Sequence, residues 1–111
     1  MDSTINFLKA ISDKNRLLIL YLLHNHTLCV CDIQNVIPLT QGALSIQLRK
    51  LTSVGLLESF KQGKWVFYKL SQTIKPFNLS ILSELFKTIN TDKDVQTMLN
   101  QLQITEKCQL L

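Results

Sequence analysis

Apolar residues recur at helical spacing along most of the chain. This pattern predicts six helices, at about 3–11, 13–24, 30–37, 40–54, 76–89 and 91–102. In the helix at 13–24 apolar side chains cover most of the circumference, so we expect this helix at the centre of the core. In the helix at 40–54, Leu44, Leu48 and Leu51 form a single stripe. One face of that helix should therefore lie against the core and the opposite face should be exposed.

Short polar residues, prolines and one glycine predict where these helices begin and end. Pro76 fits the first turn of the fifth helix, and Gly55 ends the fourth. Pro38 ends the third helix because proline disfavours a helical conformation at the residue before it. The expected N-caps are Ser3 or Thr4 for the first helix, Ser12 or Asp13 for the second, and Thr91 for the last.

Two β-prone runs follow the helix at 40–54. They cover 56–60 and 65–70 and are joined by Lys61, Gln62, Gly63 and Lys64, which predicts a β-hairpin with a basic tip. Two helices joined by a short turn and followed by a hairpin are typical of a winged helix-turn-helix. We therefore predict a mainly α fold of order α-α-α-α-β-β-α-α, in a single domain that spans residues 1–111.

The first helix and the helix at 76–89 are more apolar than the surface of a monomer is expected to be. With 111 residues, of which 46% are apolar, the chain can build only a modest core, and a dimer interface would add to it. We therefore predict a homodimer that pairs through helices at about 3–11 and 76–102. The chain has no apolar run of the roughly 20 residues needed to span a bilayer and no secretory signal pattern, so we expect a cytoplasmic protein.

Positive charge is concentrated on the helix at 40–54 and on the hairpin. The whole chain has a net charge of +4, and residues 41–75 contain six basic residues against the single acid Glu58. Localised basicity is the electrostatic signature of phosphate binding, although a solvated surface can also carry it. On the helix, Gly42, Ile46 and Arg49 project opposite the leucines. The candidate DNA contacts from this geometry are those three, their neighbours Ala43, Ser45 and Lys50, and Lys61 and Lys64 of the hairpin tip.

The strongest chemical signal is a pair of cysteines in the segment Leu-Cys-Val-Cys-Asp at 28–32. Two thiolates one residue apart are suitable ligands for a soft, thiophilic ion, whereas the alternative is a pair of buried core cysteines. A regular helix would set Cys29 and Cys31 about 200° apart. We therefore expect the pair at the start of the helix, where the cap residue is not yet helical and the helix dipole favours thiolate. The chain has three cysteines, and an odd number argues against a disulfide scaffold.

Several segments together resemble the ArsR/SmtB family of metal-sensing bacterial repressors, in particular its arsenical-resistance branch. They are LKAISDKNRLLILYLL, LCVCD, LTQGALSIQLRKL, VGLLES and GKWVFYKL, within about residues 7–70. The resemblance implies a homodimeric winged helix-turn-helix repressor that leaves its operator DNA when trivalent arsenic or antimony, As(III) or Sb(III), binds to cysteine thiolates. It also implies that the first and penultimate helices form the dimer interface. Within the implied recognition helix, Gln41, Ser45, Gln47 and Arg49 are expected to face DNA.

The third sulfur ligand that trivalent arsenic prefers is not in its usual place. Many proteins of the arsenical branch have a cysteine three residues after the second, where this chain has Gln34. Cys108 of the C-terminal tail is the candidate third ligand, and a small external thiol is the alternative. Two further repressor hypotheses share the fold: a response to cadmium or zinc, in which His24 and His26 could add nitrogen, and a redox switch that pairs Cys29 or Cys31 with Cys108.

Enzyme activity is not expected from this sequence. A small thiol reductase would require a C-x-x-C motif or a βαβ pattern, and a phosphate-binding enzyme would require a glycine-rich loop. The chain has none of these patterns. The sequence therefore favours a DNA-binding repressor over a thiol enzyme.

Overall fold

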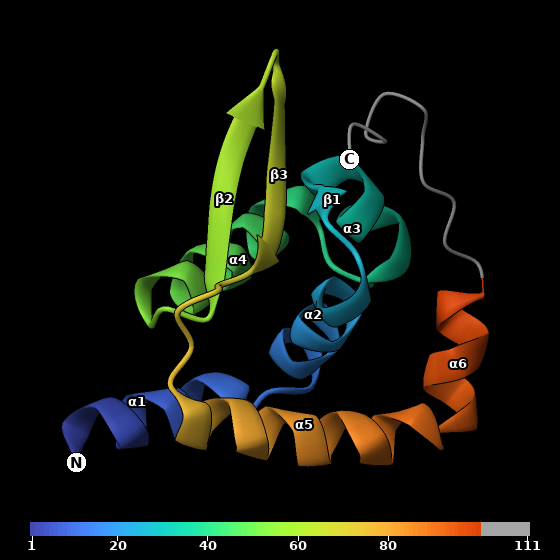
Figure 1. Ribbon diagram of the computed structural model, residues 1–111. Helices are drawn as coiled ribbons and strands as arrows, with labels where there is room; N and C mark the ends of the chain where they lie inside the picture. The colour runs from blue at the N-terminus through green and yellow to red at the C-terminus, as the bar shows by residue number, and fades with distance from the viewer. Residues whose placement is uncertain (101–111) are drawn as a thin grey trace.

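The computed structural model describes residues 1–100 (Figure 1). Its elements are, in order, α1 Asp2–Ile11, α2 Lys14–Asn25, β1 Leu28–Cys29, α3 Val30–Val36, α4 Gln41–Ser53, β2 Leu57–Gln62, β3 Trp65–Leu70, α5 Pro76–Asn90 and α6 Lys93–Leu99. This order confirms the mainly helical winged helix-turn-helix that the sequence predicted. The short strand β1 was not predicted, because two residues are too few to show an alternating pattern.

The three strands form one antiparallel sheet in the order β1-β3-β2. The hairpin of β2 and β3, the wing, is closed by the pair Gln62 and Trp65, so only Gly63 and Lys64 form its turn. Gly63 has a φ of 62°, which glycine adopts without strain and which permits a two-residue turn. The observed turn is therefore two residues shorter than the predicted four-residue tip, because Lys61 and Gln62 belong to β2.

One predicted helix cap is correct, and α4 has a cap that was not predicted. The carboxylate of Asp13 accepts a hydrogen bond from the backbone N–H of Arg16, with an N···O distance of 3.0 Å, and so caps α2. The hydroxyl of Thr40 accepts from the backbone N–H of Ala43 at 3.2 Å and caps α4. Both caps satisfy N–H groups that have no partner within the helix.

Two other predicted caps are wrong. Helix α1 begins at Asp2 with Met1 in the N-cap position, before either Ser3 or Thr4, and an acidic group in the first turn is favourable to the helix dipole. Thr91 ends α5, where its hydroxyl donates to the carbonyl of Thr88. Asp92 caps α6 in its place, because its carboxylate accepts from two backbone N–H groups of the first turn.

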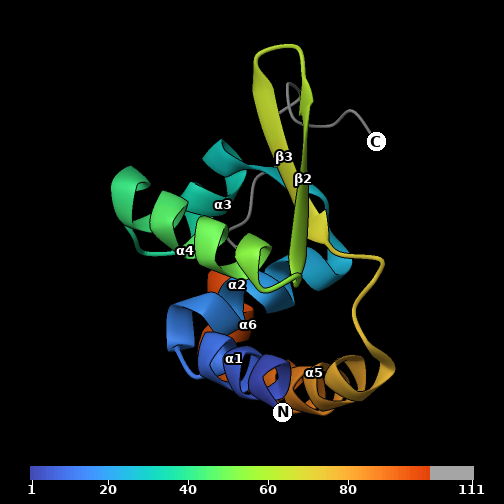
Figure 2. The same ribbon diagram turned by 90° about the vertical axis from the view of Figure 1, so that its left-hand side faces the viewer.

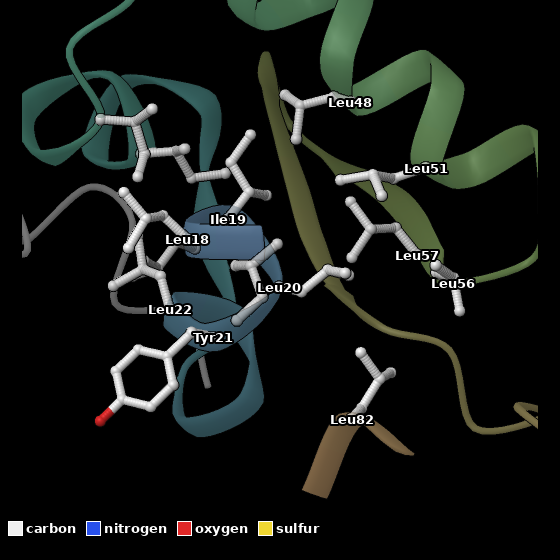
Figure 3. Close-up of a cluster of buried hydrophobic side chains, with 14 of the residues drawn as sticks. Leu18, Ile19, Leu20, Tyr21, Leu22, Leu48, Leu51, Leu56, Leu57 and Leu82 are labelled. Atoms are coloured by element: carbon white, nitrogen blue, oxygen red, sulfur yellow. The ribbon is translucent and has the colours of Figure 1, made fainter. Parts of the chain in front are cut away.

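Helix α2 lies at the centre of the main core, as its apolar composition predicted (Figure 3). Ile19 and Leu20 of this helix are fully buried. The leucine stripe of α4, which consists of Leu44, Leu48 and Leu51, is buried in the same cluster as these two side chains. This main core also includes Phe7 of α1, Ile33 of α3, Leu57 of β2, and Leu82 and Phe86 of α5.

A second, smaller apolar cluster lies at the base of the wing. Cys29 and Phe67 are buried in it, and the partly buried Cys31, Phe60 and Trp65 pack against them. The rings of Phe60 and Phe67 stack with their centroids 5.3 Å apart. We call these five residues the cysteine–wing cluster. The cluster joins the start of α3 to the wing, which projects from the helical body (Figures 1 and 2).

Helices α1 and α5 lie side by side at the end of the molecule opposite the wing tip (Figures 1 and 2). The Lys75 ammonium donates to the Ser3 hydroxyl at 3.3 Å and connects the start of each helix. Large apolar side chains are exposed on both helices, including Leu8 at 40% and Phe77 at 62%. No helix in the described part of the chain has the length and apolar character needed to cross a membrane.

Candidate cysteine site and nucleic-acid interface

The two cysteines meet at the junction of a strand and a helix. Cys29 ends β1 and is the N-cap of α3, with an extended backbone at φ −77° and ψ 162°, whereas Cys31 lies in the first turn of α3. The structure records a disulfide between them, with their Cα atoms 5.5 Å apart. The irregular backbone at the helix start therefore brings together two side chains that a regular helix would separate, as the sequence predicted.

A third ligand-bearing side chain lies beside the cysteine pair. Asp32 is fully buried, and one of its carboxylate oxygens lies with the sulfurs of Cys29 and Cys31 in a group whose atoms are all within 4.8 Å of one another. Sulfur donors select soft ions, and a carboxylate adds a harder, anionic donor. Sequence reasoning did not assign Asp32, although its place directly after Cys31 was the available signal.

The remaining candidate ligands are not part of this group. Among the described residues, the one group of at least three candidate ligands is Cys29, Cys31 and Asp32, and it includes neither His24 nor His26. The imidazole of His24 packs on Phe86 instead, with ring centroids 4.8 Å apart. Cys108, the candidate third sulfur ligand, lies outside the described residues.

The cysteine pair opens onto a groove of about 450 Å³. Val30 and Gln34 of α3 form one part of its lining, and Trp65 and Val66 of β3 form another. The first turns of α4 contribute Gln41 and Ser45, and the wing tip contributes Lys64. The cysteines and three of the predicted DNA contacts therefore line the same groove.

The predicted DNA contacts lie on the surface. Gln41, Gly42, Ile46, Arg49 and Lys50 of α4 are exposed, as are Lys61 and Lys64 of the wing, while Ala43, Ser45 and Gln47 are half-buried. A Cβ atom added at Gly42 would have no neighbour within 4 Å, so the packing of the protein does not require glycine there. The surface of α4 is consequently uncovered by the rest of the described chain at this point.

Strand pairing connects the cysteine pair to the wing. Leu28 pairs with Tyr68 and Cys29 with Phe67, both in antiparallel register. The backbone of Cys29 therefore belongs to the same sheet as the wing, while Cys31 belongs to the helix that precedes α4. A change in the distance or direction between the two sulfurs must act on at least one of these elements.

Comparisons with known proteins agree with this architecture. The family model described as "Bacterial regulatory protein, arsR family" matches residues 13–59. The cadmium resistance transcriptional regulatory protein CadC of Listeria innocua is 42% identical over 86 residues, which cover 77% of this chain and 71% of CadC. The arsenical resistance operon repressor of Escherichia coli is 38% identical over 84 residues, 75% of this chain and 72% of the repressor. The structure of HlyU from Vibrio cholerae has a TM-score of 0.72 at 30% identity and covers 81% of this chain and 95% of HlyU.

Proposed function

The chain belongs to the arsR family of bacterial regulatory proteins, and on that premise we propose that it is a homodimeric repressor whose operator affinity is controlled by trivalent arsenic or antimony at Cys29 and Cys31. The observation that supports this proposal is the shared groove. Its lining includes Cys29 and Cys31, Gln41 and Ser45 of α4, and Lys64 of the wing. A ligand held by the sulfurs would thus lie next to the surface that we propose for DNA.

The DNA side of the proposal rests on α4 and the wing. Leucines on one side of α4 attach it to the main core, while small, polar and basic side chains lie on the other side. Such a helix fits the major groove of DNA, and the wing adds basic groups for the phosphate backbone. We propose Gln41, Gly42, Ala43, Ser45, Ile46, Gln47, Arg49 and Lys50 as the reading surface, with Lys61 and Lys64 as phosphate contacts.

The ligand side rests on thiol chemistry. In the reduced protein, each thiol would form one As–S bond and arsenite would release one water for each bond, so two cysteines account for two of the three arsenic valences. We propose Cys108 for the third position, with a small external thiol as the alternative. A carboxylate oxygen of Asp32 could add a third donor beside the sulfurs of Cys29 and Cys31.

Release would follow from the position of the two cysteines. Because Cys29 is paired with β3 and Cys31 is in α3, closing the sulfurs around an ion would shift the wing, the support of α4, or both. Such coupling between sites is typically about 1 to 3 kcal/mol and is reciprocal. Operator DNA should therefore weaken arsenite binding by the same factor that arsenite weakens operator binding.

The dimer is also a proposal. Exposed apolar side chains of α1 and α5 lie at the same end of the molecule, where Ile5, Leu8, Phe77 and Leu79 are each at least 40% exposed. Pairing through these helices would cover apolar surface that a monomer leaves in water. Phe77→Ser should convert the dimer to a monomer in analytical ultracentrifugation, whereas an unchanged sedimentation coefficient would exclude α5 from the interface.

Two observations support a signal other than arsenic or antimony: cadmium in one case and thiol oxidation in the other. The relative CadC is named for cadmium resistance, and cadmium is a soft ion that two thiolates and a carboxylate also suit. The disulfide supports a thiol redox switch as the alternative, although it joins Cys29 to Cys31, whereas the redox hypothesis from the sequence paired one of them with Cys108. In that case reduction and oxidation of the pair would change the same strand and helix that an ion would change.

One titration distinguishes these candidates. A duplex is first selected from a random library by the reduced protein, and its affinity is then measured with arsenite, antimonite, cadmium, zinc or mild peroxide. We expect arsenite and antimonite to weaken binding by at least about tenfold, as a coupling of 1.4 kcal/mol would. The double variant Cys29→Ser and Cys31→Ser should bind the duplex normally and ignore both ions. Release of this variant by arsenite would overturn the proposed site.

One further variant and two further outcomes separate the remaining alternatives. Cys108→Ser should reduce arsenite affinity if Cys108 is the third ligand and should change nothing if an external thiol is. Release by peroxide together with a Cys29–Cys31 disulfide in mass spectrometry would identify the redox switch. Release by cadmium alone would assign the protein to the cadmium response.

A further inference from the structure

One arginine connects three helices at the junction between α1, α2 and α4. In the first turn of α2, Arg16 donates from Nε to the carbonyl of Ala10 at 2.6 Å and from Nη2 to the carbonyl of Lys9 at 3.2 Å. Its Nη1 donates to the Oε1 atom of Gln47 at 2.8 Å. The two carbonyls belong to the last turn of α1, and Gln47 belongs to α4. Arg16 therefore caps α1 and holds α4 with the same guanidinium group.

The geometry of this contact fixes the orientation of the Gln47 amide. An arginine side chain has only donors, so the atom of Gln47 that faces it must be the carbonyl oxygen. The oxygen thereby accepts one hydrogen bond from Arg16, which leaves its second lone pair and the NH₂ group for a partner outside the protein. Bidentate reading of adenine by glutamine requires the oxygen and the nitrogen together. Gln47 could read adenine in this arrangement only if its oxygen accepted from Arg16 and from the base at the same time.

We propose that Arg16 and Gln47 are positioning residues that set the angle between the reading helix α4 and the helix α1. This inference rests on the proposed function, in which α1 contributes to the dimer interface and α4 enters DNA. In a two-fold symmetric dimer, the angle between those helices determines how far apart the two copies of α4 lie. That separation must match the spacing of the two half-sites of the operator.

The leucine stripe of α4 does not fix this angle on its own. Leu44, Leu48 and Leu51 attach one face of the helix to the main core, and apolar contacts have little directional preference. The guanidinium group, in contrast, is rigid and planar and forms charge-assisted hydrogen bonds that are directional. Both Arg16 and Gln47 are half-buried, so their contact is partly protected from competition by water.

The test is a double-mutant cycle on operator affinity. The wild-type protein first selects a duplex from a random library, and its affinity is compared for Arg16→Met, Gln47→Met and the double variant. A hydrogen bond to a charged group is typically worth a factor of about ten, so each single variant should bind about tenfold more weakly. The double variant should bind no more weakly than Arg16→Met alone, because that substitution already removes the contact with Gln47.

Operator spacing provides a readout that a purely structural role would not change. Duplexes in which the half-sites are moved one base pair closer together or further apart are measured with each variant. We expect the wild type to prefer the selected spacing strongly and both single variants to lose most of that preference. Lys14→Met is the matched control, since it removes the same charge from an exposed position two residues away, and it should retain the preference.

The inference is wrong if the effects of Arg16→Met and Gln47→Met on operator affinity add and the spacing preference stays unchanged. If Gln47→Met then also changes the preferred base, Gln47 reads bases directly. Because Arg16→Met also deprives the end of α1 of its cap, Gln47→Met is the variant that keeps the test valid if Arg16→Met fails to fold. If the wild-type protein selects no duplex at all, the proposed function fails and not this inference alone.

Discussion

The main core and the cysteine–wing cluster hold the two halves of the proposed DNA surface in different ways. The main core draws side chains from both ends of the described chain and attaches α4 through three buried leucines. The cysteine–wing cluster has only two buried residues, Cys29 and Phe67, and supports the wing. Regions with few buried contacts open at lower free energy than the core. The more extensively buried region thus carries the helix that we propose to read DNA, and the less buried region carries the proposed ligand site.

This difference would allow the proposed cysteine site to act as a signal site in so small a protein. An ion that disturbed the main core would unfold the chain, because small domains have little stability to spare. The cysteine–wing cluster can rearrange while Ile19, Leu20 and the leucines of α4 stay packed. We therefore expect a substitution in one of these two clusters to leave the packing of the other unchanged.

The largest effect is expected from a cavity in the main core. Leu20→Ala should lower the free energy of unfolding by about 3 kcal/mol, because the side chain is fully buried and its removal leaves a cavity. Chemical denaturation measures this loss. Val54→Ala, at a position that is 37% exposed, is the control and should stay within about 0.5 kcal/mol of the wild type. A loss for Leu20→Ala no larger than that of the control would contradict the assignment of α2 as the centre of stability.

A substitution in the cysteine–wing cluster should lower the free energy of unfolding less than one in the main core, but should strongly affect hydrogen exchange nearby. Phe67→Leu should cost about 1 kcal/mol of global stability, since the side chain remains apolar and similar in volume. It should nevertheless accelerate hydrogen exchange at the β1–β3 pairs more than in α2. Exchange that rises equally in β3 and α2 would show that the two regions unfold as one unit.

An opposite pair of effects is expected at Gly42, which belongs to the reading helix. Gly42→Ala should raise the free energy of unfolding by about 0.5 kcal/mol, because alanine loses less backbone freedom and meets no neighbour. The added methyl group should at the same time weaken binding to the selected duplex. Unchanged affinity in a gel-shift titration would mean that DNA does not approach this turn of α4.

The smallest effect is expected at Glu58, the single acidic residue of the wing. The backbone N–H of Gln72 donates to Glu58 and holds the pKa of that carboxyl below its ordinary value, with a further contribution from Lys69 at 3.4 Å. A lowered pKa stabilises the folded state at pH values above the ordinary range of glutamate, and the stabilisation is lost as pH falls through the lowered pKa. NMR titration should show this lowered pKa, and Glu58→Gln should remove the dependence. An ordinary pKa would show that the contact with Gln72 does not persist in solution.

Sequence reasoning was most successful where a local pattern carries the information. The helix boundaries near Asp13 and Thr40, the hairpin and the central position of α2 all follow from caps, turn residues and apolar spacing. The convergence of the cysteines was also predictable, because it depends on the backbone of one helix start. The predicted cap at Ser3 or Thr4 is wrong because α1 begins at Asp2, and the predicted cap at Thr91 is wrong because the adjacent Asp92 caps α6.

Contacts between residues far apart in the chain were beyond such patterns. The pairing of Cys29 with Phe67 involves a strand of two residues, and nothing in either segment alone specifies the partner. The contact between Arg16 and Gln47 is similar, since each residue reads by itself as an ordinary polar residue of a helix surface. The inclusion of Asp32 in the ligand group required its burial to be known.

The position of Trp65 makes the groove observable without any added label. It is the single tryptophan of the chain, it packs in the cysteine–wing cluster, and the Lys64 ammonium lies 5.4 Å from its ring centroid. Indole emission responds to nearby heavy atoms, charges and water. Intrinsic fluorescence of the unmodified protein therefore reports events at the sulfurs and at the wing tip in one spectrum, on the timescale of a stopped-flow mixing experiment.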